Sequence, residues 1–413
     1  MLLVCGALAC SSSEPRPTPI PNPAPELSFP RKAAPASRHD ALYGALLQEA
    51  RGLSFSEGDW LEDYGDAPWY GIVASDHMGD SRRRDEALAR ARRLVAEKDL
   101  LKGDIQEMTM SALGLIERVS TTKDAGDLAL LDDFLDRLDR LASAFGWYLD
   151  LGGDVSWALR TYGPTSISAL IGLVNAQYGL LIGGARGQER LDFAVEMDQR
   201  ITERALASIR DWQGQRTVMA YRFGKEREGL FLYPNVAMIA LKARLHRLTR
   251  EDRYVKEAVA LHDAIQPLRI SDSPARYYSP YSAAEMGART RDYSTLSSHN
   301  YLALSLLLLF EVTGEDRFLE ESDRVLDALE KMRGRWCLSH VHTSARACGG
   351  TCPDRRVCVK NTCSDDRCQE GVLHHVIDGR LALPEDPSFF CAGCNLQTLY
   401  VLGYRRTLAK QAW

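Results

Sequence analysis

Cysteine is absent from most of this 413-residue chain, because none occurs between Cys10 and Cys337. Disulfides and thiolate metal sites are therefore excluded from residues 11–336. This part must fold by burying apolar side chains alone, and a hydrophobic content of 45% is enough for a large core.

Two further absences narrow the class of protein. Residues 301–312 are too short to span a membrane, and the apolar run 164–184 is interrupted by Asn175 and Gln177. The formal net charge of −5 leaves no basic excess to attract nucleic acid. We therefore expect a globular protein with no nucleic-acid partner and no internal membrane span.

The N-terminus is unlike the rest of the chain. Residues 1–10 read MLLVCGALAC, a short apolar run that ends in small residues, as export signals do. Residues 11–38 follow and hold eight of the 17 prolines, which predicts an extended, unpacked linker. The folded domain is then expected at 39–413.

The pattern around Cys10 resembles the signal of bacterial lipoproteins, in which cleavage precedes a cysteine that carries lipid. Ala7 and Leu8 depart from that signal, and Ala7-Leu8-Ala9 equally fits an ordinary cleavage site that releases the protein. The resemblance implies export to the bacterial cell envelope, as an outer-membrane lipoprotein or in the periplasm. Membrane contact would occur only through lipid on Cys10.

An internal repeat sets the architecture. LTREDRYVKEAVALHDAI at 248–265 aligns without gaps to VTGEDRFLEESDRVLDAL at 312–329, and an apolar segment precedes each copy. Each unit reads as an apolar helix, a Thr-x-Glu-Asp turn that caps the next helix, and an amphipathic helix. The repeat therefore predicts helical hairpins.

Hairpins of the same kind extend along the chain at a period of 3.6 residues. Apolar helices are predicted at 105–118, 164–183, 231–247, 298–313 and 391–409, with 40–52 as a sixth. Amphipathic helices are predicted at 84–98, 125–146, 188–212, 251–266 and 315–333. A helix that is apolar all round must be buried. The pattern therefore predicts an all-α, (α/α)6-type toroid with an inner and an outer ring; the alternative is an open solenoid.

The connections differ in length at the two ends of this toroid. Those from inner to outer helices are short, whereas the outer-to-inner connections include 147–163, 213–230, 267–297 and 334–390. Long connections are usually functional, and these all enter inner helices at their N-termini. We expect them to surround a mouth on one face; the segment 53–83 is the exception, since it follows a predicted inner helix.

Eight cysteines gather in the last of these connections, as an insertion at 337–394. Their even number in an exported protein favours disulfides, without fixing the pairing. Zinc is the alternative, but only Cys391 and Cys394 have the Cys-x2-Cys spacing it prefers. Trp336-Cys337 is similar to a fragment of the zinc-binding lanthionine cyclases, whose other motifs are absent. We predict no metal and no cofactor, with disulfides among Cys337, Cys348, Cys352, Cys358, Cys363, Cys368, Cys391 and Cys394.

Candidate site residues lie in or beside the long connections. Aromatic rings with carboxylates and hydroxyls suit a sugar, whose apolar faces stack on rings while a carboxylate pair does acid–base work. Asp292 and Glu285 are the candidate catalytic carboxylates, and His299 and Tyr281 the candidate assistants. Asn235 and Asn300 stand near the starts of apolar helices, where they either cap the helix or line the mouth. The full set of predicted binding residues is Arg289, Tyr277, Tyr278, Asp154, Trp157, Tyr162, Tyr221, Asn235 and Asn300.

The repeated sequence pattern of the hairpins over residues 84–333 resembles that of the six-hairpin glycosidase superfamily and its relatives, the (α/α)6 polysaccharide lyases and sugar epimerases. The resemblance implies substrate binding at the mouth, but no catalytic motif matches residue by residue. Two hypotheses follow: an exported, lipid-anchored, monomeric carbohydrate-active enzyme that hydrolyses, cleaves or epimerises a glycan, or a non-catalytic surface lipoprotein that binds a glycan, peptide or partner protein.

Overall fold

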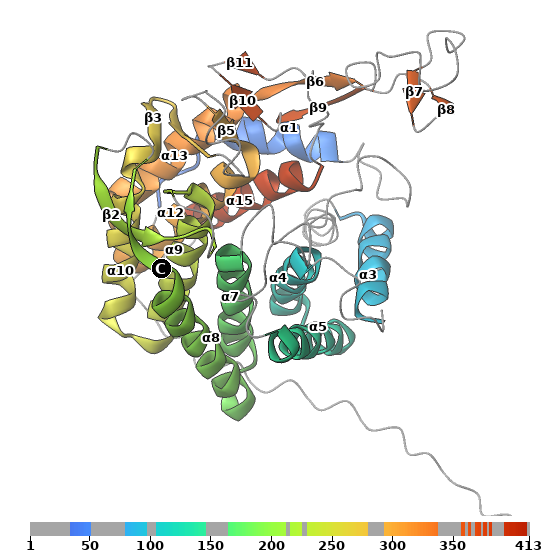
Figure 1. Cartoon of the computed structure of the whole chain (residues 1–413). Coiled ribbons are helices and arrows are strands. Elements are labelled where there is room, and N and C mark those ends of the chain that lie inside the picture. The colour runs from blue at the N-terminus through green and yellow to red at the C-terminus, as the bar shows by residue number, and fades with distance from the viewer. Residues whose placement is uncertain are drawn as a thin grey trace, which may run out of the picture.

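A computed structural model describes the following residues of the chain: 34–50, 79–96, 105–145, 164–211, 215–224, 229–279, 293–337, 357–359, 362–364, 368–372, 375–377, 380–381 and 392–410. Figure 1 shows these parts as a ring of paired helices, with short strands lying over one side of it.

Helices dominate the described residues. The inner ring is formed by α4 (Ile105–Thr122), α7 (Pro164–Ile182), α9 (Leu232–Thr249), α12 (Leu296–Thr313) and α15 (Ala392–Lys410). The outer helices are α1 (Asp40–Ala50), α3 (Ser81–Ala96), α5 (Ala125–Phe145), α8 (Gly184–Ala205), α10 (Asp252–Ala264) and α13 (Asp316–Lys331). The five inner helices confirm five of the six apolar helices that the sequence predicts.

The inner helices run in one direction. The ring of Tyr233 near the start of α9 contacts that of Tyr301 of α12 edge-on, and Arg244 near the end of α9 pairs with Glu311 near the end of α12. Pro164 at the start of α7 lies against Gly224, since a Cβ added to Gly224 would be 3.1 Å from the proline ring. Three residues before Gly224, the backbone N–H of Tyr221 donates to Asn235 near the start of α9. The N-termini of these helices therefore share one end of the ring, called the mouth end here.

The last described inner helix, α15, lies near the first, α4. Burial raises the pKa of Tyr400 on α15, and the nearby carboxylate of Glu117 on α4 raises it further. α15 also packs on α12 and on α1. Together with the ring of helices in Figure 1, this arrangement confirms the predicted toroid.

The repeated turns have the same geometry in both copies. Thr249 and Thr313 each donate to the carbonyl four residues earlier, and each accepts from the backbone N–H two residues later. Arg250 and Gly314, between the threonine and the glutamate, both adopt left-handed backbone with φ of 64° and 69°. The threonine thus caps the helix that ends. The prediction that this turn caps the next helix with a side chain was wrong, because the N-cap residues make no such bond.

The helix at 40–52 is an outer member, which corrects its assignment to the inner ring. α1 buries Leu42 and Leu46 but exposes Asp40, Ala41, Gly44 and Gln48, as expected for an amphipathic helix lying on the outside of α15. The connection that follows α1 therefore leaves an outer helix, as the other long connections do, but the next described helix, α3, is again an outer one.

The folded part begins earlier than residue 39. Ala34 is buried, and its backbone N–H donates to the carbonyl of Leu408 at 3.4 Å. Arg405 of α15 donates to the carbonyl of Pro35, and Arg38 pairs with Asp327 of α13. The last residues of the predicted 11–38 linker therefore belong to the domain.

Within the described ranges, strands occur only in the connections between helices. The helix predicted to run to 212 ends at Ala205, where the chain enters β1 (Leu206–Arg210), which pairs antiparallel with β2 (Thr217–Tyr221). β3 (Arg269–Asp272) pairs with β4 (Ala275–Tyr277) after the short helix η1 (Gln266–Leu268). β5 (Tyr293–Thr295) leads directly into α12.

The described parts of the cysteine-rich insertion are also strands. β6 (Arg333–Cys337) pairs with β9 (Cys368–Val372), and β7 (Val357–Val359) with β8 (Thr362–Ser364). β10 (His375–Ile377) pairs with both β11 (Arg380–Leu381) and β5. The insertion is thereby joined to the start of inner helix α12, at the mouth end (Figure 1).

Packing between the rings combines close helix contact with buried charge. A Cβ on Gly179 of α7 would lie 2.7 Å from the carbonyl of Gly187 on α8, so only glycine allows this approach. Lys242 of α9 is buried and pairs with Asp198 of α8 at 2.7 Å, and it also binds Glu257 of α10. Among the described helices, α7 alone is long and apolar enough to cross a membrane, but 83% of the relevant window is buried inside the protein, as in a core helix.

Candidate functional site

Polar side chains surround the mouth end of the inner ring. Every described inner helix begins with hydroxyl, amide or phenol groups that are buried among the helices, although their later turns are largely apolar. We call this set the polar belt; its members are Thr109, Ser111, Thr165, Ser166, Ser168, Tyr233, Asn235, Asn300, Tyr301, Gln397 and Thr398.

Several belt groups have no hydrogen-bond partner. The hydroxyls of Thr165, Ser166 and Ser168 at the start of α7 are fully buried and unpartnered, and so is the hydroxyl of Ser111 on α4. The side-chain N–H2 of Gln397 on α15 is likewise buried without an acceptor. An unsatisfied buried polar group costs about 1–3 kcal/mol. Such a concentration at one end of the ring is typical of a surface that completes its bonds with a ligand or water.

Other belt residues join neighbouring inner helices. Asn300 of α12 donates to the carbonyl of Cys394 at 2.9 Å and to the side-chain oxygen of Gln397 at 3.3 Å. Thr398 donates to the side-chain oxygen of Asn300 at 2.9 Å. Asn300 therefore holds α12 to α15, and it does not cap its own helix.

Asn235 has a comparable role at the start of α9. Its side-chain oxygen accepts from the backbone N–H of Tyr221 at 2.8 Å, and its N–H2 donates to the carbonyls of Phe231 and Tyr221. Tyr221 is buried, and its hydroxyl lies 2.8 Å from that of Thr202 on α8. Asn235 and Tyr221 therefore anchor the end of the β1–β2 hairpin, and their predicted contact with substrate stays a prediction.

His299 is fully buried, with both ring nitrogens engaged. Nδ1 donates to the carbonyl of Thr295 at 2.7 Å, and Nε2 accepts from the backbone N–H of Tyr277 at 3.0 Å. This tautomer is the neutral one, and burial lowers the pKa of His299 to about 4. The imidazole of His299 therefore links β4 to the start of α12. Neither of its nitrogens is free for the predicted proton transfer.

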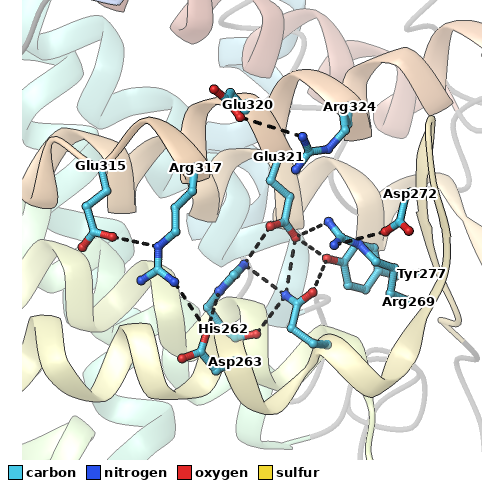
Figure 2. Close-up of polar contacts among 11 residues, drawn as sticks. His262, Asp263, Arg269, Asp272, Tyr277, Glu315, Arg317, Glu320, Glu321 and Arg324 are labelled. Atoms are coloured by element: carbon cyan, nitrogen blue, oxygen red, sulfur yellow. Dashed lines mark hydrogen bonds and ion pairs between the residues drawn. The ribbon is translucent and has the colours of Figure 1, made fainter.

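The hydroxyl of Tyr277 is directed at Glu321 of outer helix α13, as Figure 2 shows. Its hydroxyl donates to Glu321 of α13, which also accepts from His262 of α10 and pairs with Arg269 at 3.1 Å. Burial alone would raise the pKa of Glu321, but the bonds from His262 and Tyr277 and the charge of Arg269 lower it to about 2. This network joins two outer helices to the β3–β4 hairpin, and Tyr277 is buried in it.

Tyr278 is also buried, and its backbone N–H donates to the carbonyl of Leu268. The remaining predicted site residues lie outside the described part of the chain: Asp292, Glu285, Tyr281, Arg289, Asp154, Trp157 and Tyr162. The structure therefore brings none of the described predictions into an exposed cluster, and it leaves the catalytic carboxylates untested.

The mouth end has few carboxylates of its own. The first eight residues of α7, α9, α12 and α15 contain no aspartate or glutamate. A carboxylate pair acting here would have to come from the connections, where Asp292 and Glu285 stand in the sequence. Among the residues that the structure describes, no three His, Cys, Asp or Glu side chains form a metal site.

The opposite end of the inner ring, called the charged end here, holds an ion network that sequence reasoning missed. Glu311 of α12 pairs with Arg244 of α9 at 2.9 Å and with Arg247, and it accepts from the hydroxyl of Tyr404 of α15 at 2.6 Å. Burial alone would raise the pKa of Glu311, but the two guanidiniums lower it. A charge inside the otherwise apolar run 301–312 was the signal available in the sequence.

The chain has the fold of the six-hairpin glycosidase-like (α/α) toroids. Among solved structures, it is similar to a D-mannose isomerase, with a TM-score of 0.55 at 9% identity, covering 90% of this chain and 97% of that one. The GH76A α-1,6-mannanase from Salegentibacter sp. HEL1_6 gives 0.51 at 12% identity, covering 89% and 99%. The unsaturated glucuronyl hydrolase from Bacillus sp. GL1 gives 0.50 at 16%, covering 71% and 84%.

These neighbours share the fold and little sequence. An inactive variant of the same mannanase was solved with α-1,6-mannotetrose bound. No protein-family model and no curated protein matches the sequence of this chain. The comparisons therefore identify the architecture, and the activity has to be argued from this chain's own residues.

Proposed function

We propose that this protein is an exported carbohydrate-active enzyme that acts on a glycan at the mouth end of the toroid. The observation that carries the proposal is the polar belt, with its buried but unpartnered hydroxyl and amide groups on α4, α7 and α15. Support comes from the fold, because the three similar structures are a mannanase, an unsaturated glucuronyl hydrolase and a D-mannose isomerase.

The belt matches the chemistry of a sugar. A pyranose presents hydroxyls in all directions, and each can donate and accept one or more hydrogen bonds. The hydroxyl of Ser166 can do both, whereas the N–H2 of Gln397 can only donate. The ring pair Tyr233–Tyr301, with centroids 5.0 Å apart, adds apolar surface of the kind on which sugar faces stack. Neutral polar groups beside aromatic rings favour a glycan over a charged peptide.

The chemical step needs titratable groups that the described mouth end does not supply. We assign acid–base catalysis to Asp292 and Glu285, because the segment that carries them is held at both of its ends. Ser279 donates its backbone N–H to the carbonyl of Tyr293, and the Ser294 hydroxyl donates to the carbonyl of Tyr277. Both carboxylates therefore lie on a 13-residue segment, 280–292, that starts and ends at the mouth end.

Lipid anchoring at Cys10 is part of the proposal, and the position of Ala34 shows at which end of the toroid the chain enters the domain. Ala34 lies against Leu408, which is about 24 Å along α15 from the start of that helix, at 1.5 Å per residue. The chain therefore enters the domain near the charged end. A tether from that point would hold the mouth away from the membrane and toward its substrate.

A glycan screen tests the enzymatic proposal. The full chain, purified in detergent, is assayed against neutral and acidic polysaccharides and chromogenic glycosides, beside the Asp292→Asn and Glu285→Gln variants. We expect turnover in the parent and a loss of at least about a hundredfold in one variant, since a positioned general acid or base contributes this much. Turnover that neither substitution alters would refute the assignment of these carboxylates.

The alternative is a non-catalytic lipoprotein that binds a glycan, peptide or partner protein through the same face. It is supported by the buried positions of His299, which was predicted to assist catalysis, and of Tyr277, which was predicted to bind substrate, because both side chains make structural contacts. Glycan binding by calorimetry without turnover of any sugar would support this alternative.

A further inference from the structure

Two antiparallel strand pairs in the cysteine-rich insertion each place one cysteine opposite another. In the β6–β9 register, the Cα of Cys337 is the partner of the Cα of Cys368. In the β7–β8 register, the Cα of Cys358 is the partner of the Cα of Cys363. A slip of one residue in either pair would separate the cysteines, so the coincidence of two such matches is informative.

The backbone spacing at these positions suits a disulfide. Directly opposed residues of an antiparallel pair have Cα atoms about 4.5 Å or about 5.5 Å apart, depending on whether they exchange hydrogen bonds. Disulfides form at Cα separations of about 4.4–6.8 Å. Val359 and Thr362 flank the two-residue connection of the β7–β8 hairpin, so Cys358 and Cys363 form the next, closer pair.

We propose that Cys337–Cys368 and Cys358–Cys363 are disulfides. Four cysteines of the insertion then remain: Cys348, Cys352, Cys391 and Cys394. Cys394 is itself disulfide-bonded. If the other two bonds lie within this set, only three pairings are left of the 105 that eight cysteines allow. This inference does not depend on the proposed catalytic activity.

Each bond forms by thiol–disulfide exchange. A thiolate of the pair attacks the disulfide of an oxidising protein of the export compartment, and the second thiolate then displaces that protein from the mixed disulfide. Two thiols lose two protons and two electrons, and the oxidising protein leaves as a dithiol. The bonds therefore require an oxidising compartment, which links the covalent structure to the predicted export.

The position of the strands gives the crosslinks a consequence for the mouth end. β9 contacts α1, and β10, three residues beyond β9, pairs with β5 through Val376 and Ser294. β5 is the last segment before α12. The Cys337–Cys368 bond would close about thirty residues into a loop and hold β9 to β6, so that β10 stays paired with β5.

Peptide mapping without reduction tests the proposal directly, because trypsin separates these cysteines. Cleavage after arginine and lysine leaves Cys337 in 336–346, Cys358 in 357–360, Cys363 in 361–367 and Cys368 in 368–380, with one cysteine in each. The chain is taken from the envelope of an exporting host, and free thiols are blocked at low pH before digestion.

We expect two linked species, 336–346 with 368–380 and 357–360 with 361–367, which disappear on reduction. A bond from any of these four peptides to a different partner would overturn the proposal. Alkylation of all four cysteines in the unreduced, denatured chain would also overturn it, because it would show that the thiols are free. One equivalent of zinc per chain by elemental analysis would then indicate a metal site. Cys337→Ser and Cys358→Ser variants provide a second measurement: each should free one thiol, on Cys368 and Cys363 respectively, and labelling at any other cysteine would contradict the pairing.

Discussion

The two ends of the inner ring are built from the same helices and carry opposite chemistry. At the mouth end, the belt is neutral, and several of its hydroxyl and amide groups lack partners. At the charged end, Glu311 is engaged by two guanidiniums and a phenol from α9 and α15. The carboxylate at the charged end is thus fully engaged, although Arg244 Nε beside it has no partner, whereas several hydroxyl and amide groups at the mouth end have none.

The difference indicates that one end of the ring contributes to stability and the other to binding. Buried ions that are fully paired contribute to holding inner helices together, but only while every partner is present. Buried hydroxyls without partners lower the stability of the fold, and they leave hydrogen-bonding capacity for a ligand. Substitutions at the charged end should therefore change the free energy of unfolding, and substitutions in the belt should change binding.

The largest loss of stability is expected from Glu311→Leu. Removal of the carboxylate leaves Arg244, whose side chain is 11% exposed, buried without its counter-ion. We expect the free energy of unfolding to fall by about 3–5 kcal/mol, the usual cost of breaking a buried pair. Urea unfolding measures it. The exposed pair Arg82–Glu86 of α3 is the control, and Glu86→Leu should cost less than about 1 kcal/mol. Equal losses in the two variants would contradict the role of the charged end.

The second effect concerns the crosslinks at the mouth end. Loss of the Cys337–Cys368 bond, through the double serine variant, should lower the free energy of unfolding by about 3 kcal/mol, because it closes a long loop. Loss of Cys358–Cys363, which closes a few residues, should cost about 2 kcal/mol or less. Denaturant unfolding under non-reducing conditions compares the two variants. A larger cost for the short loop would refute the loop-length argument.

The third effect is a pH dependence caused by His299. Its pKa in the folded protein is about 4, below the unfolded value of about 6.5, so the unfolded chain binds more protons between these pH values. Stability is complete above pH 6.5 and is lost as the pH falls toward 4, by about 3 kcal/mol in total.

A matched variant separates this effect from other acid transitions. His299→Gln retains an acceptor for Tyr277 and cannot be charged, so its unfolding free energy should change less between pH 7.5 and 4.5. Glu321, with a pKa of about 2, titrates below this window. An unchanged pH slope in the variant would show that His299 is not the group responsible.

The smallest effect on stability is expected in the belt itself. Ser166→Ala removes a buried hydroxyl that has no partner, so the free energy of unfolding should not fall and should rise by about 1 kcal/mol, as the penalty of the unsatisfied group is removed. Glycan affinity, measured by calorimetry, should fall up to about tenfold, the equivalent of one hydrogen bond of about 1.4 kcal/mol. Ser305→Ala is the control, because that hydroxyl bonds the carbonyls of Val236 and Tyr301: it should lose about 1 kcal/mol of stability and no affinity.

Much of the fold could be predicted from local pattern. The repeat at 248–265 and 312–329 and the apolar helices follow from spacing along the chain, and short-range hydrogen bonds decide helix formation. α1 was misplaced because its eleven residues have too weak a pattern to distinguish a ring position. The end of α8 at Ala205 was missed because β1 depends on its partner β2, which lies beyond a turn.

The candidate site could be predicted only in part. Asn235, Asn300 and His299 were correctly placed near the starts of inner helices, but their side chains bind backbone groups of segments that are distant in sequence. Asn300 illustrates the difficulty, since its partner Cys394 is 94 residues away. The unpartnered hydroxyls of α7 were not singled out, because serine and threonine at a helix start are common and only burial distinguishes them.

The periodicity of apolar residues determined by itself that this chain folds into helical hairpins of two kinds, since burial of an apolar surface demands that arrangement. Only the tertiary structure decided that the last inner helix lies near the first, that α1 lies on the outside of the ring, and that ions gather at one end and unsatisfied hydroxyls at the other. The physical reason is that hydrophobic burial depends on spacing along the chain, whereas hydrogen bonds and ion pairs depend on which distant groups meet at about 3 Å.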